Sequence, residues 1–380
     1  MPADFFDCRG EICVDITAYR KNAADMIALV RCAVNEEKPD AKLIEQLDLP
    51  ALFEICQAHI LTACTAYALE SAGIHDAAFT EEKNKAIRKN LILDSERAKI
   101  LNRLEQEKIW YMPLKGAVMK DWYPRLGMRQ MSDNDILFDS SARKRVRAVM
   151  EELGFSCDEF GKGKDDSYKK LPVSNFEMHN SLFSAVHPDK LQTYYEDVTP
   201  LMQPIGGTSY GRCFGNEDFY LYVLAHTYKH YVYGGTGVRS LLDIEIILRK
   251  IGSKLDRSYL ERELDKLGLT EFEEQNRLLA AKLFRDGTEL SDSEKEKLDY
   301  YVTSGVYGSS IHLQENRIQQ QNGSRLRYIF HRIFPPMDQV KVTDPFFYRH
   351  KLLMPILWIW RPIRSWKLVF AELKQLLKKK

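Results

Sequence analysis

The hydrophobic positions of the first hundred residues repeat with the spacing of amphipathic helices. This spacing runs through 22–34 and 43–69, and Pro50 restarts the helical turn within the second segment. A longer and more highly charged helix is predicted over 80–107, where the apolar residues form one stripe. The pattern therefore predicts an all-helical N-terminal region, 1–107.

At Lys108 the pattern changes to short apolar segments, which are typical of buried strands. Strand, helix, strand, helix, strand and strand are predicted in that order at 109–112, 117–122, 131–138, 140–153, 155–160 and 175–183. This order indicates a small α/β core, which we assign to 108–215.

Helical spacing returns after the core. Helices are predicted over 218–233 and 240–250, separated by a glycine-rich loop, and charged helices continue beyond them. We therefore predict a helical domain over 216–324 and a separate C-terminal segment over 325–380. The predicted fold class is α+β, with a small mixed-sheet core flanked by N-terminal and C-terminal helical regions.

The composition is that of a folded globular protein. The chain has 380 residues, of which 44% are hydrophobic and 29% are charged. These values exclude a disordered chain, a collagen-like repeat and a polytopic membrane protein. The net charge is only +1, so the whole-chain charge gives no strong case for binding nucleic acid.

Cysteine usage and apolar runs favour a cytoplasmic localisation. The seven cysteines are odd in number and show no C-x-x-C spacing, which predicts neither a disulfide framework nor a zinc ribbon. The first residues lack the basic flank and long apolar segment of a secretory signal. The longest apolar run, 352–360, contains Pro355 and falls short of the ~20 residues that span a bilayer.

The charge is unevenly distributed, because 325–380 alone carries 13 basic and 3 acidic residues. Three of the five tryptophans (Trp358, Trp360 and Trp366) lie in the same segment. A basic, tryptophan-containing segment can make a peripheral contact with an anionic membrane. It can also fold onto the acidic remainder of the chain, with Trp358 and Trp360 buried there. We favour this second interpretation and leave the membrane contact as its alternative.

The strongest chemical signal is a D-x-D motif, Asp133 and Asp135, at the start of a predicted strand. Side chains at i and i+2 of a strand share one face, so the two carboxylates point the same way beside an apolar segment. Their mutual repulsion is commonly relieved by a hard divalent cation such as Mg²⁺. Two exposed aspartates at a polar strand end are the alternative, since short motifs often occur without a function.

The surroundings of the motif strengthen the metal interpretation. Upstream, Lys115 and Gly116 lie between a predicted strand and a predicted helix, where a glycine lets the backbone approach a phosphate. Downstream, Glu177 adds a third carboxylate on a later strand. Asp121 and Asp139 are nearby carboxylates that do not fit the motif.

These motifs, in this order, resemble the bacterial uncharacterised nucleotidyltransferase family, within the DNA polymerase β-type nucleotidyltransferase superfamily. The resemblance covers most of the chain. It rests on two stretches, Leu114-Lys115-Gly116 … Tyr123 … Arg129 … Asp133-x-Asp135-Ile136-Leu137 and His226-x-x-x-His230 … Gly237-x-Arg239-x-Leu241-x-Asp243.

The resemblance implies Mg²⁺-dependent transfer of a nucleoside monophosphate from an NTP to an acceptor hydroxyl. Asp133, Asp135 and Glu177 would then hold Mg²⁺ or Mn²⁺, and Glu177 would also help to deprotonate the acceptor. Lys115 and Gly116 would contact the β- and γ-phosphates. The chain departs from the superfamily pattern at Ala117, where serine is common, and at Asn134, where an apolar residue is common.

Several further residues have both a functional and a structural interpretation. Arg129 can bind a phosphate or form a surface ion pair. The histidines 226 and 230 share a helix face and can line the acceptor pocket or pack structurally. Zinc binding is a third alternative, but the sequence shows no clear third ligand beside the two histidines. Arg239 can line the acceptor pocket or form an i,i+4 ion pair with Asp243. His179 can line the acceptor pocket, orient Glu177 or be a buried structural histidine.

Three functions are compatible with this sequence. The first is an active nucleotidyltransferase, and the second is a catalytically weak nucleotide-binding protein of the same fold. The third is a membrane-surface accessory protein that acts through its basic C-terminal segment. The sequence leaves open the base of the NTP, the acceptor and the oligomeric state.

Overall fold

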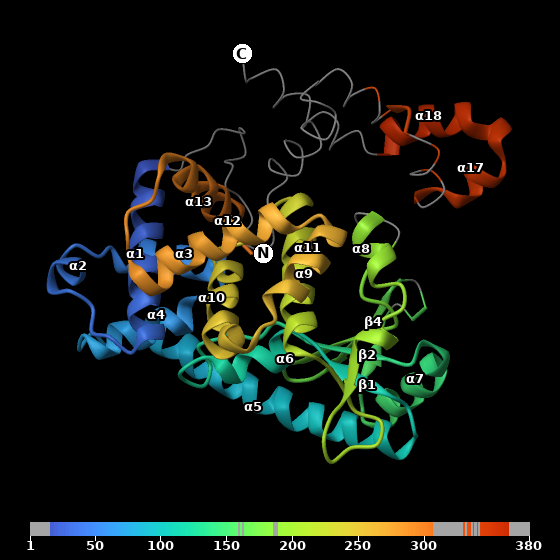
Figure 1. Ribbon diagram of the computed structural model, residues 1–380, viewed down its shortest axis with the longest axis horizontal. Helices are drawn as coiled ribbons and strands as arrows, with labels where there is room; N and C mark the ends of the chain where they lie inside the picture. The colour runs from blue at the N-terminus through green and yellow to red at the C-terminus, as the bar shows by residue number, and fades with distance from the viewer. Residues whose placement is uncertain are drawn as a thin grey trace.

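The computed structural model describes residues 16–158, 160–161, 163–184, 189–306 and 343–364, together with 330, 333–335, 337 and 340. The fold is α+β, as the sequence predicts, with one small mixed sheet and a two-stranded sheet among many helices (Figure 1). Cys8, Cys13, Trp366, the lysines 378–380 and the helical segments predicted over 307–321 lie outside the described residues.

The main sheet has the strand order β1-β2-β5-β4-β3. Only β2 and β5 are parallel, and the other neighbours are antiparallel. The strands are β1 (Tyr111–Pro113), β2 (Asn134–Phe138), β3 (Ser156–Cys157), β4 (Asp165–Lys170) and β5 (Ser174–His179), and a second sheet pairs β6 (Met202–Pro204) with β7 (Arg212–Phe214).

Strand β4, like β6 and β7, is an element that the sequence pattern misses. It forms a hairpin with β5, whereas the sequence predicted no strand between 155–160 and 175–183. Of its six residues only Asp166 and Tyr168 are buried, and four carry a charge. Pairing with β5 stabilises β4, so its own residues need only a weak hydrophobic alternation. That alternation is too weak to be recognised from the sequence.

The predicted helix 43–69 is divided into three helices. Asp40 and Asp48 cap the first two, and Ile60 adopts a left-handed conformation that ends the second. The N-terminal helices are α1 (Ile16–Asn35), α2 (Ala41–Glu45), α3 (Leu49–His59), α4 (Thr62–Ser71) and α5 (Ala77–Gln106).

Helix α5 connects the helical part of the molecule to the sheet. Its side chains Leu93, Ile100 and Leu104 are buried in one hydrophobic cluster with Phe176 and Met178 of β5. In Figure 1 this long helix runs along the lower edge of the molecule, beside the sheet. Helix α7 (Arg143–Glu152) packs against it.

The helices before and after the sheet share one hydrophobic core. Helix α1 contacts α3, α4 and α13, and the same cluster of buried residues extends from Ala23 to Val302. The two helical regions predicted separately, 1–107 and 216–324, are thus packed together. The later helices are α8 (Asp189–Tyr194), α9 (Asn216–Val232), α10 (Arg239–Ile251), α11 (Arg257–Leu267), α12 (Thr270–Ala281), a π-helical turn (Lys282–Asp286) and α13 (Asp292–Ser304).

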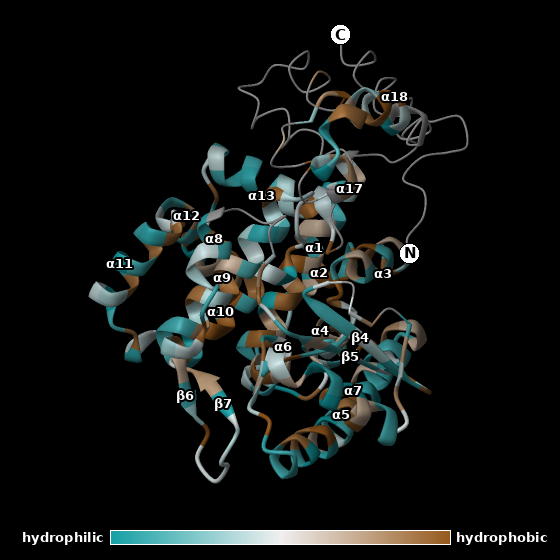
Figure 2. Ribbon diagram, turned by 90° about the vertical axis from the view of Figure 1, so that its right-hand side faces the viewer, coloured by the Kyte–Doolittle hydropathy of each residue, from teal (hydrophilic) through white to brown (hydrophobic). Residues whose placement is uncertain are grey.

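The C-terminal helices α17 (Pro345–Arg349) and α18 (Met354–Arg364) form a small cluster of their own around Val340 and Leu357. They lie at one end of the molecule, and hydrophobic colouring follows α18 in Figure 2. Trp358 packs on Phe334 within this cluster, but Trp360 is 43% exposed. The expected burial of Trp360 against the N-terminal or central helices is therefore wrong.

None of the described helices combines the length and the hydropathy needed to cross a bilayer. The described cysteines, Cys32, Cys56, Cys64, Cys157 and Cys213, are all free thiols. For these five, the structure agrees with the absence of a disulfide framework.

Candidate functional site

The parallel pairing of β2 with β5 brings two of the predicted carboxylates together. Asp135 and Glu177 are direct register partners, although 41 residues lie between them in the sequence. Asp133 comes just before β2 and lines the same cavity. The carboxylates that the D-x-D motif and the later strand supply therefore meet at one place.

His179 also belongs to this group. Single ligand atoms of Asp135, Glu177 and His179 all lie within 4.8 Å of one another, a grouping that could hold a metal ion. The sequence instead grouped Asp133 with Asp135 and Glu177 as the ligand set and gave His179 a place in the acceptor pocket or beside Glu177. Its place in this group has no sequence signal beyond lying two residues from Glu177 on the same strand.

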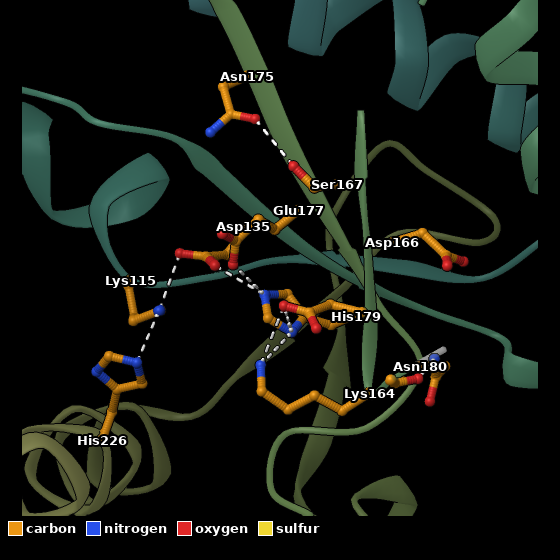
Figure 3. A network of polar contacts seen from close by, with 12 residues as sticks. Lys115, Asp135, Lys164, Asp166, Ser167, Asn175, Glu177, His179, Asn180 and His226 are labelled. Atoms are coloured by element: carbon orange, nitrogen blue, oxygen red, sulfur yellow. Dashed lines mark hydrogen bonds and ion pairs between the residues drawn. The ribbon is translucent and has the colours of Figure 1, made fainter. Parts of the chain in front are cut away.

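Two hydrogen bonds fix the orientation and the tautomer of His179 (Figure 3). Its Nε2 lies 2.7 Å from Asp135 Oδ1, and its Nδ1 lies 3.2 Å from the Lys164 ammonium. Because a carboxylate accepts and an ammonium donates, Nε2 carries the hydrogen and Nδ1 accepts. Burial lowers the pKa of His179, so the ring is neutral when it donates to Asp135.

Lys115 supplies the nearest positive charge. Its ammonium lies 3.0 Å from Asp135 Oδ2 and 3.0 Å from His226 Nε2 (Figure 3). Burial alone would raise the pKa of Asp135, but Lys115 and the His179 hydrogen bond hold that pKa below its ordinary value. Asp135 is therefore ionised throughout the neutral pH range.

Nearby cations compensate the other two carboxylates only in part. Burial, followed by the charge of Asp135, raises the pKa of Asp133. Burial and the charges of Asp135, Asp133 and Asp165 raise the pKa of Glu177 to about 7. Three carboxylates thus repel one another in a partly buried place, which is the condition that a bound divalent cation relieves.

The glycine turn has a different basis from the one the sequence suggests. Ala117 N donates to Leu114 O across 3.1 Å, and Lys115 has φ 41° and ψ −111°, close to the first central residue of a type II′ turn. That position favours glycine, so a lysine here is strained. Helix α6 (Gly116–Met119) has only four residues, and its dipole is correspondingly weak.

Gly116 is required by Arg129. A Cβ at Gly116 would lie 2.3 Å from Arg129 Nη1, which leaves no room for any side chain. Arg129 itself is buried and forms a bidentate ion pair with Asp243, at 2.9 Å for Nε to Oδ1 and 3.0 Å for Nη2 to Oδ2. Tyr123 also donates to Asp243, across 2.6 Å.

This ion pair differs from both expectations for the residues involved. The ion pair of Arg129 is buried, whereas a surface ion pair was expected for this residue. Asp243 pairs with Arg129, whereas an ion pair between Asp243 and Arg239 was expected. Because Asp243 faces the glycine turn, Arg239 is left to donate to Gln130 O across 3.1 Å. Arg239 lines the cavity, as an acceptor-pocket residue would.

His226 and His230 lie side by side on α9, with their Nε2 atoms 3.3 Å apart. Burial, followed by the charge of Lys115, holds the pKa of His226 well below its ordinary value. Both rings line the cavity, but the metal-binding group found among the described residues does not include them. The geometry supports a pocket-lining role over a zinc site.

All of these residues surround one cavity of about 300 Å³. Two lysines in its wall, Lys164 and Lys229, were missed by the sequence analysis. Lys164 follows a glycine-rich loop, and Lys229 is flanked by the two histidines on α9, so neither has a motif of its own. The predicted residues that line the cavity are Lys115, Gly116, Arg129, Asp133, Asp135, Glu177, His179, His226, His230 and Arg239.

We expect Asp243→Ala to destabilise the protein strongly. The substitution leaves the guanidinium of Arg129 buried without its counter-charge, which costs about 3–5 kcal/mol of unfolding free energy. Urea unfolding measures this loss. The double variant Arg129→Met/Asp243→Leu removes both charges and should recover much of the stability. A loss below about 1 kcal/mol for Asp243→Ala would contradict a structural role for the pair.

We expect Glu177→Gln to raise the melting temperature in EDTA at pH 8 more than at pH 5. The folded-state pKa of Glu177 is about 7 against an ordinary value of 4.5, so the folded state binds the extra proton between these values. The wild type therefore loses stability as the pH rises through this window. The Glu177→Gln variant does not, because glutamine cannot ionise. A difference that is independent of pH would show that Glu177 is not under charge repulsion.

The comparison with known proteins agrees with this geometry. A family model described as "Uncharacterised nucleotidyltransferase" matches residues 45–285, a stretch that contains every site residue named in this subsection. No curated protein and no solved structure matches the chain. Because the matched stretch makes up more than half of the 380 residues, the chain belongs to the uncharacterised nucleotidyltransferase family.

Proposed function

We propose that this protein transfers a nucleoside monophosphate from an NTP to an acceptor hydroxyl with the help of a divalent cation. Family membership supports transferase activity in general. The observation that carries the specific proposal is the convergence of Asp133, Asp135 and Glu177 on one cavity that also contains several cations. Carboxylates are needed to hold the metal, and cations are needed to receive the triphosphate.

The donor set suits Mg²⁺ or Mn²⁺. Carboxylate oxygens are the ligands these ions prefer, and burial with mutual repulsion raises the pKa values of Asp133 and Glu177, so a cation between them is favourable. Asp133, Asp135 and Glu177 would hold the ion, with His179 beside them. The bound ion supplies charge neutralisation at the triphosphate.

In the proposed reaction, the acceptor oxygen bonds to the α-phosphorus while the bond to the bridging oxygen breaks and pyrophosphate leaves. Glu177 takes the proton of the attacking hydroxyl as the general base. His179 holds Asp135 in orientation through its 2.7 Å hydrogen bond. When the triphosphate binds, the ammonium of Lys115 interacts with the phosphates as well as with Asp135. It then balances part of the negative charge of the phosphates.

The two departures from the superfamily pattern bear unequally on this proposal. Asn134 is buried on the opposite face of β2, where its Oδ1 accepts from Arg97 Nη1 across 2.8 Å. It does not line the cavity. Ala117 lacks the hydroxyl that commonly contacts phosphate, so more of the triphosphate contact falls to lysine and arginine side chains. The strand, turn and helix followed by carboxylates on two strands support the resemblance to the DNA polymerase β-type superfamily.

A catalytically weak nucleotide-binding protein is the alternative that shares this site. Both candidates predict that an NTP with Mg²⁺ raises the melting temperature, because a ligand that binds only the folded state stabilises it. Only the enzyme also transfers the label. Bacterial origin and cytoplasmic localisation stay predictions from the sequence.

We expect the purified protein to transfer label from at least one α-labelled NTP to a component of a cell extract in Mg²⁺, and not in EDTA. Asp135→Asn should lower this labelling by about 100-fold or more, since even residues that only orient a metal ligand cost 10–100-fold. Asp121→Asn is the matched control, because Asp121 is 64% exposed and does not line the cavity.

Two results would change the assignment. Full labelling by a folded Asp135→Asn variant would contradict the metal-binding role of this carboxylate. Binding of Mg²⁺ and NTP by the wild type without any labelling would favour the weak nucleotide-binding protein.

The C-terminal helices support a second candidate function, peripheral contact with an anionic membrane. Three apolar side chains of α18, Ile356, Ile359 and Trp360, are 55%, 67% and 43% exposed, and Leu352 just before the helix is 96% exposed. The segment 325–380 around them carries 13 basic and 3 acidic residues. Apolar side chains enter the headgroup region and each nearby Lys or Arg adds ~1 kcal/mol on an anionic surface.

We expect the protein to sediment with anionic vesicles at low salt and to be released at high salt. Ile356→Glu/Ile359→Glu should abolish sedimentation, because it removes the apolar anchor while leaving the basic residues in place. Leu278→Glu on α12 is a matched control, since Leu278 is 46% exposed and lies outside the segment. Unchanged sedimentation of the double variant would exclude this contact.

A further inference from the structure

The cations that line the cavity are unequally neutralised. Lys115 pairs with Asp135, Arg129 pairs with Asp243, and Lys164 pairs with Asp165 at 3.3 Å. The other two cations, Lys229 and Arg239, have no carboxylate within ion-pairing distance in the part of the chain that the structure describes. Lys229 also has no hydrogen-bond partner for its ammonium there.

Lys229 and Arg239 lie at different ends of the carboxylate group. The charges that act most strongly on Lys229 are those of Lys164 and Lys115. Those that act most strongly on Arg239 are the charges of Arg129 and Asp243. Of the site carboxylates, Asp133 acts on Arg239, whereas Asp135 and Asp165 act on Lys229. Arg239 is therefore on the side of Gly116, which packs against Arg129, while Lys229 is on the side of Lys164 and the β4–β5 hairpin, where the charge of Lys115 also reaches it.

In in-line phosphoryl transfer, the two ends of the site receive two different reactants, the triphosphate and the acceptor. The leaving pyrophosphate and the attacking hydroxyl lie on opposite sides of the transferred phosphorus. If the triphosphate takes the glycine-turn end beside Arg239, the acceptor must enter from the end that carries Lys164 and Lys229. This step rests on the proposed function.

We propose that Lys229, with Lys164 beside it, binds a phosphate group carried by the acceptor, so that the substrate class is a small phosphorylated molecule with a free hydroxyl. Lys229 is only 9% exposed, and burying an ammonium without a counter-charge is unfavourable. A phosphate bound there supplies the missing charge to Lys229 and also interacts with the ammonium of Lys164. In the absence of an anion, burial and the charges of Lys164 and Lys115 lower the pKa of Lys229 to about 7.

The charge of the rest of the protein favours a small acceptor over a polynucleotide. A nucleic acid presents many phosphates and binds to an extended basic surface. Outside 325–380 the chain has a net charge of −9, because that segment carries +10 of the total of +1. The net charge of the chain outside this segment therefore gives no case for an extended basic surface around the cavity.

Isothermal titration with inorganic phosphate tests this subsite. The protein is first saturated with Mg²⁺ and a non-hydrolysable α,β-methylene NTP, with the four bases tried in turn, and phosphate is then titrated. We expect the wild type to bind phosphate in addition to the analogue. Lys229→Met should weaken phosphate binding about tenfold or more while changing the affinity for the analogue less than about twofold.

Two further variants make the result specific. Lys144→Met is the matched control for loss of one positive charge, because Lys144 is exposed on α7 and does not line the cavity. Lys164→Met should also weaken phosphate binding, and it provides the same readout if Lys229→Met does not fold.

The outcomes separate this inference from the function on which it rests. If phosphate displaces the analogue, and Lys229→Met weakens the analogue instead, Lys229 is a triphosphate ligand and the acceptor assignment is overturned. Equal phosphate binding by wild type and Lys229→Met also overturns it. If the wild type binds no analogue with Mg²⁺, the proposed function itself fails.

Discussion

The candidate site depends on one constraint, the parallel pairing of β2 and β5 that places Asp135 opposite Glu177. A buried and a half-buried carboxylate placed opposite each other repel, so the protein must either protonate one or provide positive charge. It does both in part. Lys115 and His179 keep Asp135 ionised, and Glu177 is left with a pKa of about 7. A divalent cation would complete the compensation.

The buried pair of Arg129 and Asp243 holds the opposite side of the cavity in place. Asp243 belongs to α10, whereas Arg129 packs against Gly116, so the pair fastens the helical part of the molecule to the glycine turn. The same turn positions Lys115 beside Asp135. Helices that share a core with the N-terminal region thus determine where the ammonium of Lys115 lies.

Much of this site could be predicted from local sequence. The alternation of a strand places Asp133 and Asp135 on one side, and a glycine between a strand and a helix indicates a close backbone approach. Glu177 could be added because the order of elements resembles a known family. These inferences need only the period of a strand, the flexibility of glycine and the order of motifs along the chain.

The remaining features depend on contacts between distant segments. Nothing near Arg129 or Asp243 in the sequence shows that they pair across 113 intervening residues. Lys164 and Lys229 become part of the site only when the β4–β5 hairpin and α9 face the same cavity. The short strand β4 is likewise stabilised by its neighbour more than by its own residues, which is why a pattern based on hydrophobic alternation does not detect it.

The unequal neutralisation of the cavity connects the site to its chemistry. Carboxylates in the middle suit a metal, and positive charge toward both ends suits two anionic reactants. The most direct test of this account is anomalous diffraction from crystals soaked with Mn²⁺ and a non-hydrolysable NTP. The account predicts a Mn²⁺ peak about 2.0–2.2 Å from carboxylate oxygens of Asp135 and Glu177. A bound nucleotide with no peak there, or a peak between His226 and His230, would contradict it.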